Sequence, residues 1–359
     1  MQQESGTIQA MEASHSINQD QLWMSRALEI AHNGLGTTSP NPPVGAVIVK
    51  NGKLIGEGWH ELAGEPHAEK RAIMNACLKG NADELAGATI YVTLEPCSSH
   101  GKTPPCTDAI IEAGIKRVVY GAVDPDERHR GRADAILEAH GIRVRSECCA
   151  RSCELLLRSW AYATQFKRPW VTAKVACTMD GRMTRAGLKW LSCEESVRFA
   201  HQMRLESDAI LVGGNTLRLD NPALTIRKPY REVPAVKKQP WRIVMTKDSS
   251  TLPDTAKVFT DKDAERTLIR ENVGDLKAML HAFYEQQGVV NLMLECGGNL
   301  LRTFLQEGLI NEWVQIITPQ LTGGPDLVLP GYFMPKERIF EQEELIPSGK
   351  DIILRGLIH

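Results

Sequence analysis

The sequence contains no apolar run of the length that crosses a bilayer, which takes about 18 residues or more. It also lacks the pattern of a secreted disulfide framework, because its nine cysteines are an odd number spread over 359 residues. Aromatic residues make up only 6%, and the formal net charge is only −2. These absences argue against a membrane protein, a disulfide-stapled secreted domain and a protein with a globally basic surface for nucleic acid.

Residues 1–18 lack the basic segment and the apolar segment of a signal peptide. We therefore expect a flexible N-terminal tail and a cytoplasmic protein. The remaining length suits two domains of about 100–200 residues each. We expect them at 19–148 and 169–359, with a connecting helix at 149–168.

Hydrophobic periodicity predicts a layered α/β domain over residues 19–148, with helices on both faces of a sheet. Asn51-Gly52 predicts a tight hairpin turn. Helices are expected at 19–33, 68–79, 107–113 and 131–139, and strands at 44–49, 53–59, 89–94, 117–123 and 142–145.

The second domain is also predicted to be α/β, and residues 225–241 are expected to form a loop. Strands are expected at 171–176, 209–212, 242–245, 289–294, 312–318 and 351–357, and helices at 194–205 and 300–306.

His67, Cys97 and Cys106 are candidate ligands of a zinc ion. One imidazole and two thiolates make three bonds to zinc and leave the fourth position open, which distinguishes catalytic zinc from structural zinc. Glu69 is the candidate carboxylate that moves a proton beside the metal. Residues two apart point to different sides of a helix, so His67 and Glu69 can cooperate only at a helix end. The break at Gly64-Glu65-Pro66 fits a helix that begins there.

This set resembles the zinc-dependent base deaminases, whose signature is H-x-E followed by P-C-x-x-C. Here eight residues, not two, separate the two cysteines. The sequence therefore predicts a hydrolytic deaminase acting on an amino-pyrimidine. The alternatives are buried, non-ligating side chains and a closed structural zinc site that takes His60 or His100 as its fourth ligand.

Four segments together resemble the bifunctional riboflavin-biosynthesis deaminase/reductase family. They are PNPPVG at 40–45, GEGWH at 56–60, GEPHAE at 64–69, and TLEPC at 93–97 continuing to GKTPPC at 101–106. The last run is specific to the family and accounts for the long cysteine spacing. The resemblance spans about residues 19–357. It implies a cytidine-deaminase-like three-layer domain, followed by a dihydrofolate-reductase-like α/β domain, with one Zn²⁺ per deaminase site and NADPH as cofactors.

The resemblance implies that the first domain hydrolyses the ring amine of 2,5-diamino-6-ribosylamino-4(3H)-pyrimidinone 5′-phosphate. It makes Glu69 the catalytic proton shuttle and gives zinc the three ligands named above. The positions that it matches to substrate binding are Asn41, His60, Lys102 and Thr103. One departure is Ser99, which stands where the family commonly has a histidine near the phosphate.

The resemblance also implies that the second domain reduces the ribosyl group to ribityl with NADPH. Substrate-side positions are Arg204, Leu224, Arg227 and Glu295. Cofactor-side positions are Lys174, Ala176, Trp190, Thr216, Asp220, Gly297, Gly298, Asn299, Leu300, Leu301, Arg302 and Thr303. Leu188, Asn221 and Thr246-Lys247 depart from the family's pattern. Lys247 fits either the extra phosphate of NADPH or an ordinary surface charge.

Two other functions remain open at this point. One is a deaminase whose second domain has become structural, because the departures gather there. The other is a nucleic-acid base deaminase, which predicts a basic channel with interleaved aromatic residues. The few tyrosines and phenylalanines do not gather near the zinc motif. We expect a small phosphorylated pyrimidine as the partner, no nucleic acid and no membrane, and a homo-oligomer.

Overall fold

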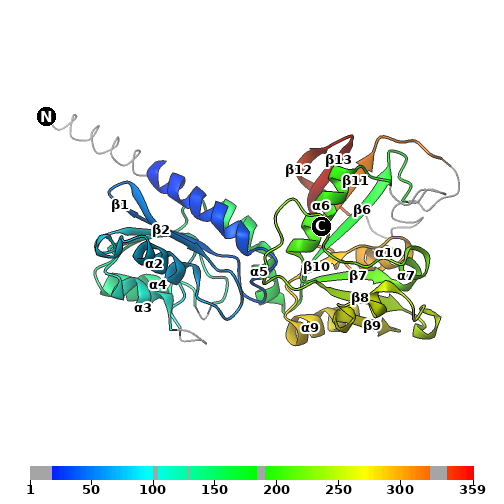
Figure 1. The fold of residues 1–359 in the computed structure, drawn as a ribbon, viewed down its shortest axis with the longest axis horizontal. Helices are drawn as coiled ribbons and strands as arrows, with labels where there is room; N and C mark the ends of the chain where they lie inside the picture. Colours follow the sequence, from blue (N-terminus) through cyan, green and yellow to red (C-terminus); the bar gives the residue numbers. More distant parts are fainter. Residues whose placement is uncertain (1–17, 100–103, 128, 184–190, 324–337) are drawn as a thin grey trace. The chain divides into compact units, whose positions relative to one another are not determined.

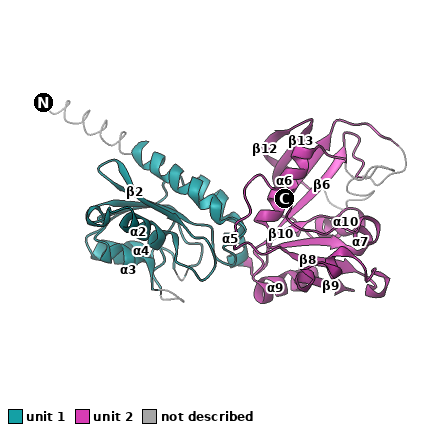
Figure 2. Ribbon diagram, viewed as in Figure 1, with its two compact units in different colours: residues 1–165 teal, residues 166–359 magenta. Residues whose placement is uncertain are grey.

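The computed structural model describes residues 18–99, 104–127, 129–183, 191–323 and 338–359. The chain divides into two compact units, Met1–Gln165 and Phe166–His359 (Figure 2). Within the described ranges no helix has both the length and the apolar character needed to cross a membrane.

The first unit contains a five-stranded sheet in the order β2-β1-β3-β4-β5 (Figure 1). Its strands are β1 (Gly45–Lys50), β2 (Lys53–Trp59), β3 (Thr89–Leu94), β4 (Arg117–Ala122) and β5 (Arg143–Arg145). β1 runs antiparallel to β2 and β3, whereas β3, β4 and β5 are parallel. Between β1 and β2, Asn51 and Gly52 have φ angles of 51° and 74°. Two consecutive left-handed residues define the predicted hairpin turn.

Helices cover both faces of this sheet (Figure 1). They are a helix at 18–31, α2 (Ala68–Leu78), α3 (Cys106–Glu112), α4 (Arg132–Ala139) and α5 (Ala150–Phe166). Two glycines allow helices to lie directly on opposite faces. A Cβ atom at Gly45 would collide with the carbonyl oxygen of Ala27 in the helix at 18–31, and one at Gly56 would collide with that of Ala72 in α2. The three-layer α/β prediction is confirmed.

The second unit contains an eight-stranded sheet in the order β12-β13-β11-β6-β10-β7-β8-β9. Its strands are β6 (Trp170–Thr178), β7 (Ala209–Gly213), β8 (Trp241–Thr246), β9 (Thr267–Glu271), β10 (Asn291–Leu294), β11 (Glu312–Thr318), β12 (Phe340–Ser348) and β13 (Asp351–Ile358). The strands from β11 to β9 are parallel, and the β12–β13 hairpin adds an antiparallel edge.

The helices of the second unit connect these parallel strands. They are α6 (Glu194–Glu206), α7 (Gly214–Asp220), α8 (Lys257–Thr260), α9 (Leu276–Gln287) and α10 (Gly298–Gln306). The carboxyl ends of β6, β10, β7 and β8 therefore lie at one edge of the sheet. In open α/β sheets, ligands bind in the crevice outside this edge.

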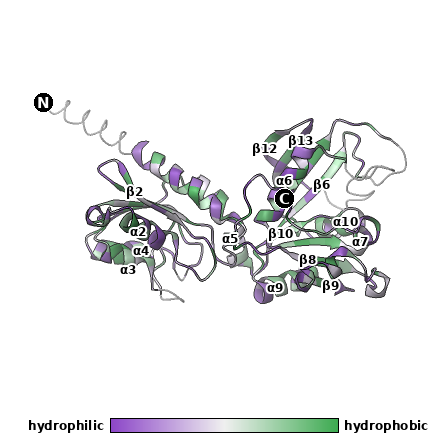
Figure 3. Ribbon diagram, viewed as in Figure 1, coloured by the Kyte–Doolittle hydropathy of each residue, from purple (hydrophilic) through white to green (hydrophobic). Residues whose placement is uncertain are grey.

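Hydrophobic residues concentrate in the central strands of both sheets (Figure 3). In the second unit Leu211, Ile243 and Leu292 are at most 1% exposed. These central strands match the sequence prediction closely. The sequence predicted no element at α7, α8, α9, β9 or β12. β9 and β12 are edge strands, so they lack the apolar alternation that marks a strand with one buried face.

Candidate active sites

The first site forms where two helices begin beside the end of a strand. His67 is the N-cap residue of α2, and Glu69 lies in the first turn of that helix. Cys97 follows β3 by three residues, and Cys106 is the first residue of α3. The backbone N–H groups of Cys106 and Thr107 both bond to the carbonyl oxygen of Cys97, which ties α3 to the strand end. The predicted placement of His67 at a helix cap is confirmed.

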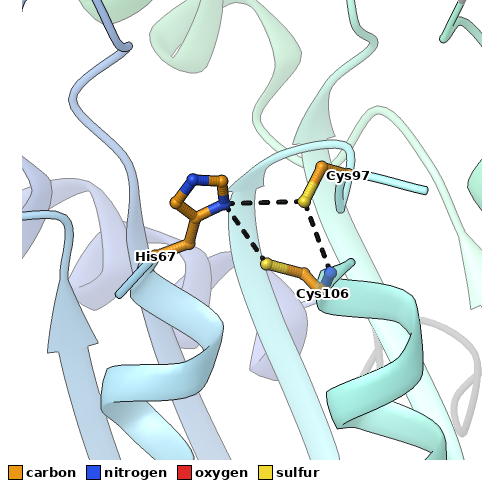
Figure 4. Close-up of side chains that lie close together, drawn as sticks. All are labelled: His67, Cys97 and Cys106. Carbon is orange, nitrogen blue, oxygen red and sulfur yellow. Dashed lines mark hydrogen bonds between the residues drawn. The ribbon is translucent and has the colours of Figure 1, made fainter. Parts of the chain in front are cut away.

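Three potential metal-ligating atoms converge at this point (Figure 4). His67 Nδ1 lies 3.5 Å from Cys97 Sγ and 3.4 Å from Cys106 Sγ. All three atoms lie within 4.8 Å of one another. Tetrahedral zinc, with bonds of about 2.0–2.1 Å to nitrogen and about 2.3 Å to sulfur, separates such ligands by about 3.5 Å. The donor set and its spacing therefore fit zinc.

The thiols and the carboxyl of this site have pKa values that differ from their ordinary ones. The Cys106 thiol and the His67 imidazole hydrogen-bond to Cys97 and lower the pKa of its thiol, whereas the same pairing raises the pKa of Cys106. The position of Cys106 at a helix N-terminus acts in the opposite direction and favours its thiolate form. Glu69 is only 4% exposed, and its burial raises the pKa of its carboxyl.

His60 lies against this site with both ring nitrogens occupied. Its Nε2 is 3.0 Å from the side-chain nitrogen of Asn41, and its Nδ1 is 3.2 Å from the carbonyl oxygen of Pro66. The ring therefore donates to Pro66 and accepts from Asn41, which requires the neutral form. Burial, above all, lowers the pKa of His60 to about 4. The structure thus brings Asn41, His60 and the His67 segment together.

Glu95 lies in the TLEPC motif, and its residue type predicts no role in the chemistry. The residue is 4% exposed, and its carboxylate accepts hydrogen bonds from the backbone N–H groups of Asp124, Gly131 and Ala133. Glu95 therefore fixes the loop between β4 and α4 beside the strand end that leads to Cys97. From that loop His129 reaches Ser99, with 3.3 Å between Nδ1 and Oγ. Lys102 and Thr103 lie outside the described residues.

The second site is an ion-pair network at the carboxyl edge of the larger sheet. Glu295 follows β10, and its carboxylate contacts Arg204 of α6 at 2.6 and 3.0 Å and Lys174 of β6 at 3.3 Å. Burial alone would raise the pKa of Glu295, but Arg204 and Lys174 outweigh it and lower the pKa. Lys174 and Ala176 lie two residues apart on β6 and so share a face.

The two substrate-side arginines differ in their surroundings. Arg204 is 8% exposed, and its remaining hydrogen bond, from Nη1, goes to the carbonyl oxygen of Thr225 at 3.1 Å. Arg227 is exposed, and among the described residues its guanidinium forms no ion pair and donates only to the Thr225 hydroxyl, at 3.2 Å. The guanidinium of Arg204 is therefore occupied by bonds within the unit, whereas that of Arg227 has donors that are accessible to a ligand.

Glycines shape the turn from β10 into α10. Gly297 is the N-cap residue of α10, and Gly298 adopts a left-handed φ of 56°. The first N–H groups of a helix are free to bind an anion such as a phosphate group of NADPH, so this turn fits the cofactor. Leu301 is buried, whereas Asn299, Leu300, Arg302 and Thr303 reach the surface to different degrees. Thr216 and Asp220 lie on α7, which begins at the carboxyl end of the neighbouring β7.

Two residues that depart from the family pattern, Asn221 and Thr246, have specific structural roles in the part of the chain that the structure describes. Asn221 ends α7 in a left-handed conformation with φ of 41°, which asparagine tolerates well, and its Oδ1 accepts from the Lys257 N–H. Thr246 bonds through Oγ1 to the backbone of Asp248. Leu188 and Trp190 lie outside the described residues.

Family models match both halves of the chain. A model described as the RibD C-terminal domain matches residues 169–354, and one described as the cytidine and deoxycytidylate deaminase zinc-binding region matches residues 17–122. The RibD protein of Aquifex aeolicus is 39% identical over 327 residues, which cover 85% of this chain and 88% of that protein. The chain belongs to the RibD family.

Other RibD proteins agree over nearly the full length. That of Escherichia coli is 36% identical over 371 residues, covering 94% of this chain and 98% of its own. A crystal form of Acinetobacter baumannii RibD superposes with a TM-score of 0.85 at 33% identity, covering 96% of this chain and 99% of that one. The Thermotoga maritima structure, named a diaminohydroxyphosphoribosylaminopyrimidine deaminase/5-amino-6-(5-phosphoribosylamino)uracil reductase, has a TM-score of 0.83 at 32% identity, covering 95% and 99%.

Membership in the RibD family settles the general activity. The chain is a bifunctional enzyme of riboflavin biosynthesis, with hydrolase and oxidoreductase activities that use Zn²⁺ and NADPH. A structural second domain and a nucleic-acid base deaminase are not favoured, because the family match includes the reductase half and extends over most of the chain.

Proposed function

We propose that this chain deaminates 2,5-diamino-6-ribosylamino-4(3H)-pyrimidinone 5′-phosphate and then reduces the ribosyl group of the product to ribityl with NADPH. The convergence of His67, Cys97 and Cys106 beside the buried Glu69 is the observation that carries the proposal. We assign the deaminase to residues 19–148 and the reductase to 169–359, with 149–168 as the connecting segment and 1–18 as a tail. The family matches at 17–122 and 169–354 support these boundaries.

In the deaminase we assign His67, Cys97 and Cys106 as the zinc ligands. Zinc held by this set would act as a Lewis acid and would bring the pKa of a water at the open position near neutrality. Glu69 would accept a proton from the water as the water oxygen bonds to the ring carbon that carries the amine, and would deliver it to the amine nitrogen as the exocyclic C–N bond breaks and ammonia leaves. Burial raises the pKa of the Glu69 carboxyl, which suits a group that takes up and releases a proton near neutral pH.

We propose that Asn41 binds the polar edge of the pyrimidine through its side-chain oxygen, because its nitrogen is engaged by His60. His60 then acts by orienting Asn41. Lys102 and Thr103 are proposed to bind the substrate phosphate, since a cation and a hydroxyl group suit phosphate oxygens.

In the reductase, NADPH supplies the hydride, and we propose that its phosphates bind at the α10 N-terminus. The cofactor side comprises Lys174, Ala176, Trp190, Thr216, Asp220 and the run from Gly297 to Thr303. The substrate side comprises Arg204, Leu224, Arg227 and Glu295. Arg227 binds the substrate phosphate in this proposal, because its guanidinium is open and can bind phosphate with two hydrogen bonds.

We also propose a cytoplasmic homo-oligomer. All nine cysteines are free thiols, which suits a reducing compartment. On one face of the β12–β13 hairpin Leu345 and Ile352 are 56% and 47% exposed, and an apolar sheet face of this kind suits a second copy of the chain. Ile352→Lys should lower the mass measured by light scattering, whereas an unchanged mass would exclude this face as the interface.

The direct test follows ammonia and NADPH in one sample of zinc-loaded enzyme given the diaminopyrimidinone substrate. Ammonia release followed by NADPH oxidation is expected. Removing zinc with a chelator should stop ammonia release but leave reduction of the pre-deaminated substrate intact. Ammonia release without NADPH oxidation would restrict the chain to deamination. The absence of both signals would refute the substrate assignment.

A further inference from the structure

Two buried side chains, one turn apart on helix α6, form hydrogen bonds with the backbone of the loop at 224–227. His201 is 4% exposed and Arg204 is 8% exposed. Arg204 donates from Nη1 to the carbonyl oxygen of Thr225 at 3.1 Å, and His201 Nδ1 accepts from the backbone N–H of Arg227 at 3.2 Å. The helix thus holds the loop through both a backbone acceptor and a backbone donor.

The backbone of this loop includes an unfavourable conformation that its surroundings must stabilise. Leu224, which precedes the hydrogen-bonded residues, adopts a left-handed φ of 53°. This conformation is unfavourable for a bulky residue that is not glycine, and it persists only where the surroundings enforce it. Leu224 itself is 2% exposed, so packing secures one end of the loop and α6 secures the other.

The bond from Arg227 specifies the state of the imidazole. A nitrogen that accepts a hydrogen bond carries no proton, so His201 is neutral with its proton on Nε2. The charged groups facing it are Arg204 on α6, Arg227 on the loop, Glu295 after β10 and Lys174 on β6. Burial, followed by the two arginines, lowers the pKa of His201 to about 4, in agreement with the geometry.

We propose that His201 is a positioning residue of the reductase: by accepting the Arg227 N–H, it holds the loop so that the open Arg227 guanidinium meets the anionic group of the substrate. This inference rests on the reductase function proposed above. His201 acts through Arg227, so its loss should weaken the binding of a phosphorylated substrate more than it slows hydride transfer. A substrate without the phosphate should be insensitive to it.

The test compares two substitutions of similar size that differ in hydrogen bonding. In His201→Asn the side-chain oxygen can still accept from the Arg227 N–H, whereas His201→Leu leaves this N–H without a partner. We expect His201→Leu to raise KM for the phosphorylated aminouracil about 10-fold or more, as for a buried donor that loses its acceptor. Its kcat and its KM for NADPH should stay within about 2-fold, and His201→Asn should restore KM.

A double-mutant cycle with Arg227→Ala shows whether the effect passes through Arg227. In that background His201→Leu should add little to KM, and with the dephosphorylated substrate it should have no effect. The proposal would be overturned if the effects of the two substitutions on KM were fully additive. It would also be overturned if the Asn and Leu variants raised KM equally, or if only kcat fell. Turnover by the unaltered enzyme in the same assay reports separately on the proposed reductase function.

Nitrogen-15 NMR of histidine-labelled protein gives a readout that is independent of catalysis. At pH 7 the His201 ring should show an unprotonated Nδ1 and a protonated Nε2, with the signal assigned by its loss in His201→Asn. A protonated Nδ1 would overturn the proposal even if the kinetics agreed. Deaminase activity, measured as ammonia release, should be unchanged in every His201 variant, and an unchanged KM for NADPH confirms that the reductase unit is folded.

Discussion

The two sites of this enzyme differ in what completes them. In the deaminase His67, Cys97 and Cys106 place three ligating atoms within 4.8 Å, an arrangement that a metal ion completes. In the reductase Glu295 is already paired with Arg204 and Lys174. The first site is therefore a set of donors assembled for an ion. In the second site the acidic and basic groups pair with one another, and Arg227 is a cation that has no ion pair among the described residues and can meet the substrate.

Both sites nevertheless use a buried neutral histidine in the same way. His60 accepts from the Asn41 side chain, and His201 accepts from the Arg227 backbone. Burial lowers the pKa of each to about 4. Each ring thus remains an acceptor at neutral pH and holds a residue that we assign to the substrate.

The largest expected effect separates catalysis from metal binding in the deaminase. Glu69→Gln should retain zinc and lower the rate of ammonia release about 10²–10⁴-fold, the range for loss of a general acid–base group. Metal analysis and an ammonia assay measure the two quantities. Glu65→Gln is the matched control, because Glu65 lies in the preceding loop with its side chain 54% exposed. Retained turnover in Glu69→Gln would remove Glu69 from the mechanism.

The second prediction concerns the internal network of the reductase. Glu295→Gln should lower the free energy of unfolding of this unit by about 3–5 kcal/mol, because it leaves Arg204 buried without its counter-charge. Chemical denaturation followed by tryptophan fluorescence measures the change. Glu285→Gln, at an exposed position of α9, is the control. A loss below about 1 kcal/mol would show that the ion pair does not hold the unit together.

The same network predicts a dependence on pH. The pKa of Glu295 in the folded chain lies below its ordinary value of 4.5. Its contribution is therefore fully present above that value and is lost as the pH falls toward the folded pKa. The stability difference between the unaltered chain and Glu295→Gln should narrow below about pH 4.5. A constant difference across that range would contradict a lowered pKa.

The contrast between the sites also explains what the sequence could predict. The zinc ligands and Glu69 lie in short motifs whose chemistry is evident from residue type, and the positions of α2, β3 and α3 follow from apolar spacing. The Glu295–Arg204 pair joins residues 91 positions apart, and the His201–Arg227 contact depends on a loop of irregular backbone. Neither has a local pattern. Only the family resemblance drew attention to Arg204 and Glu295, and His201 was missed because a lone histidine on a helix carries no signal.

A third, smaller effect tests whether Arg227, rather than Arg204, binds the substrate phosphate. Arg227→Ala should raise KM of the reductase for its phosphorylated substrate about 10–100-fold, as for loss of a charge-assisted hydrogen bond, and leave deamination unchanged. Steady-state NADPH oxidation measures it. Lys228→Ala is the control, because this neighbour is exposed and forms an exposed ion pair with Glu194 at 3.5 Å. Loss of both activities would instead indicate a folding defect.

The smallest expected effect concerns Lys247, which follows β8 at the carboxyl edge of the sheet and is exposed. If it meets the extra phosphate of NADPH, Lys247→Ala should raise KM for NADPH about 1.5–5-fold, because exposed ion pairs contribute about 0.2–1 kcal/mol. The KM for NADH, which lacks that phosphate, should not change. Because salt screens exposed charges, the effect should shrink as ionic strength rises from 0.01 to about 1 M. If the substitution changed KM for NADPH and for NADH equally, Lys247 would be an ordinary surface charge. The α10 N-terminus would then remain the proposed site for the phosphates of NADPH.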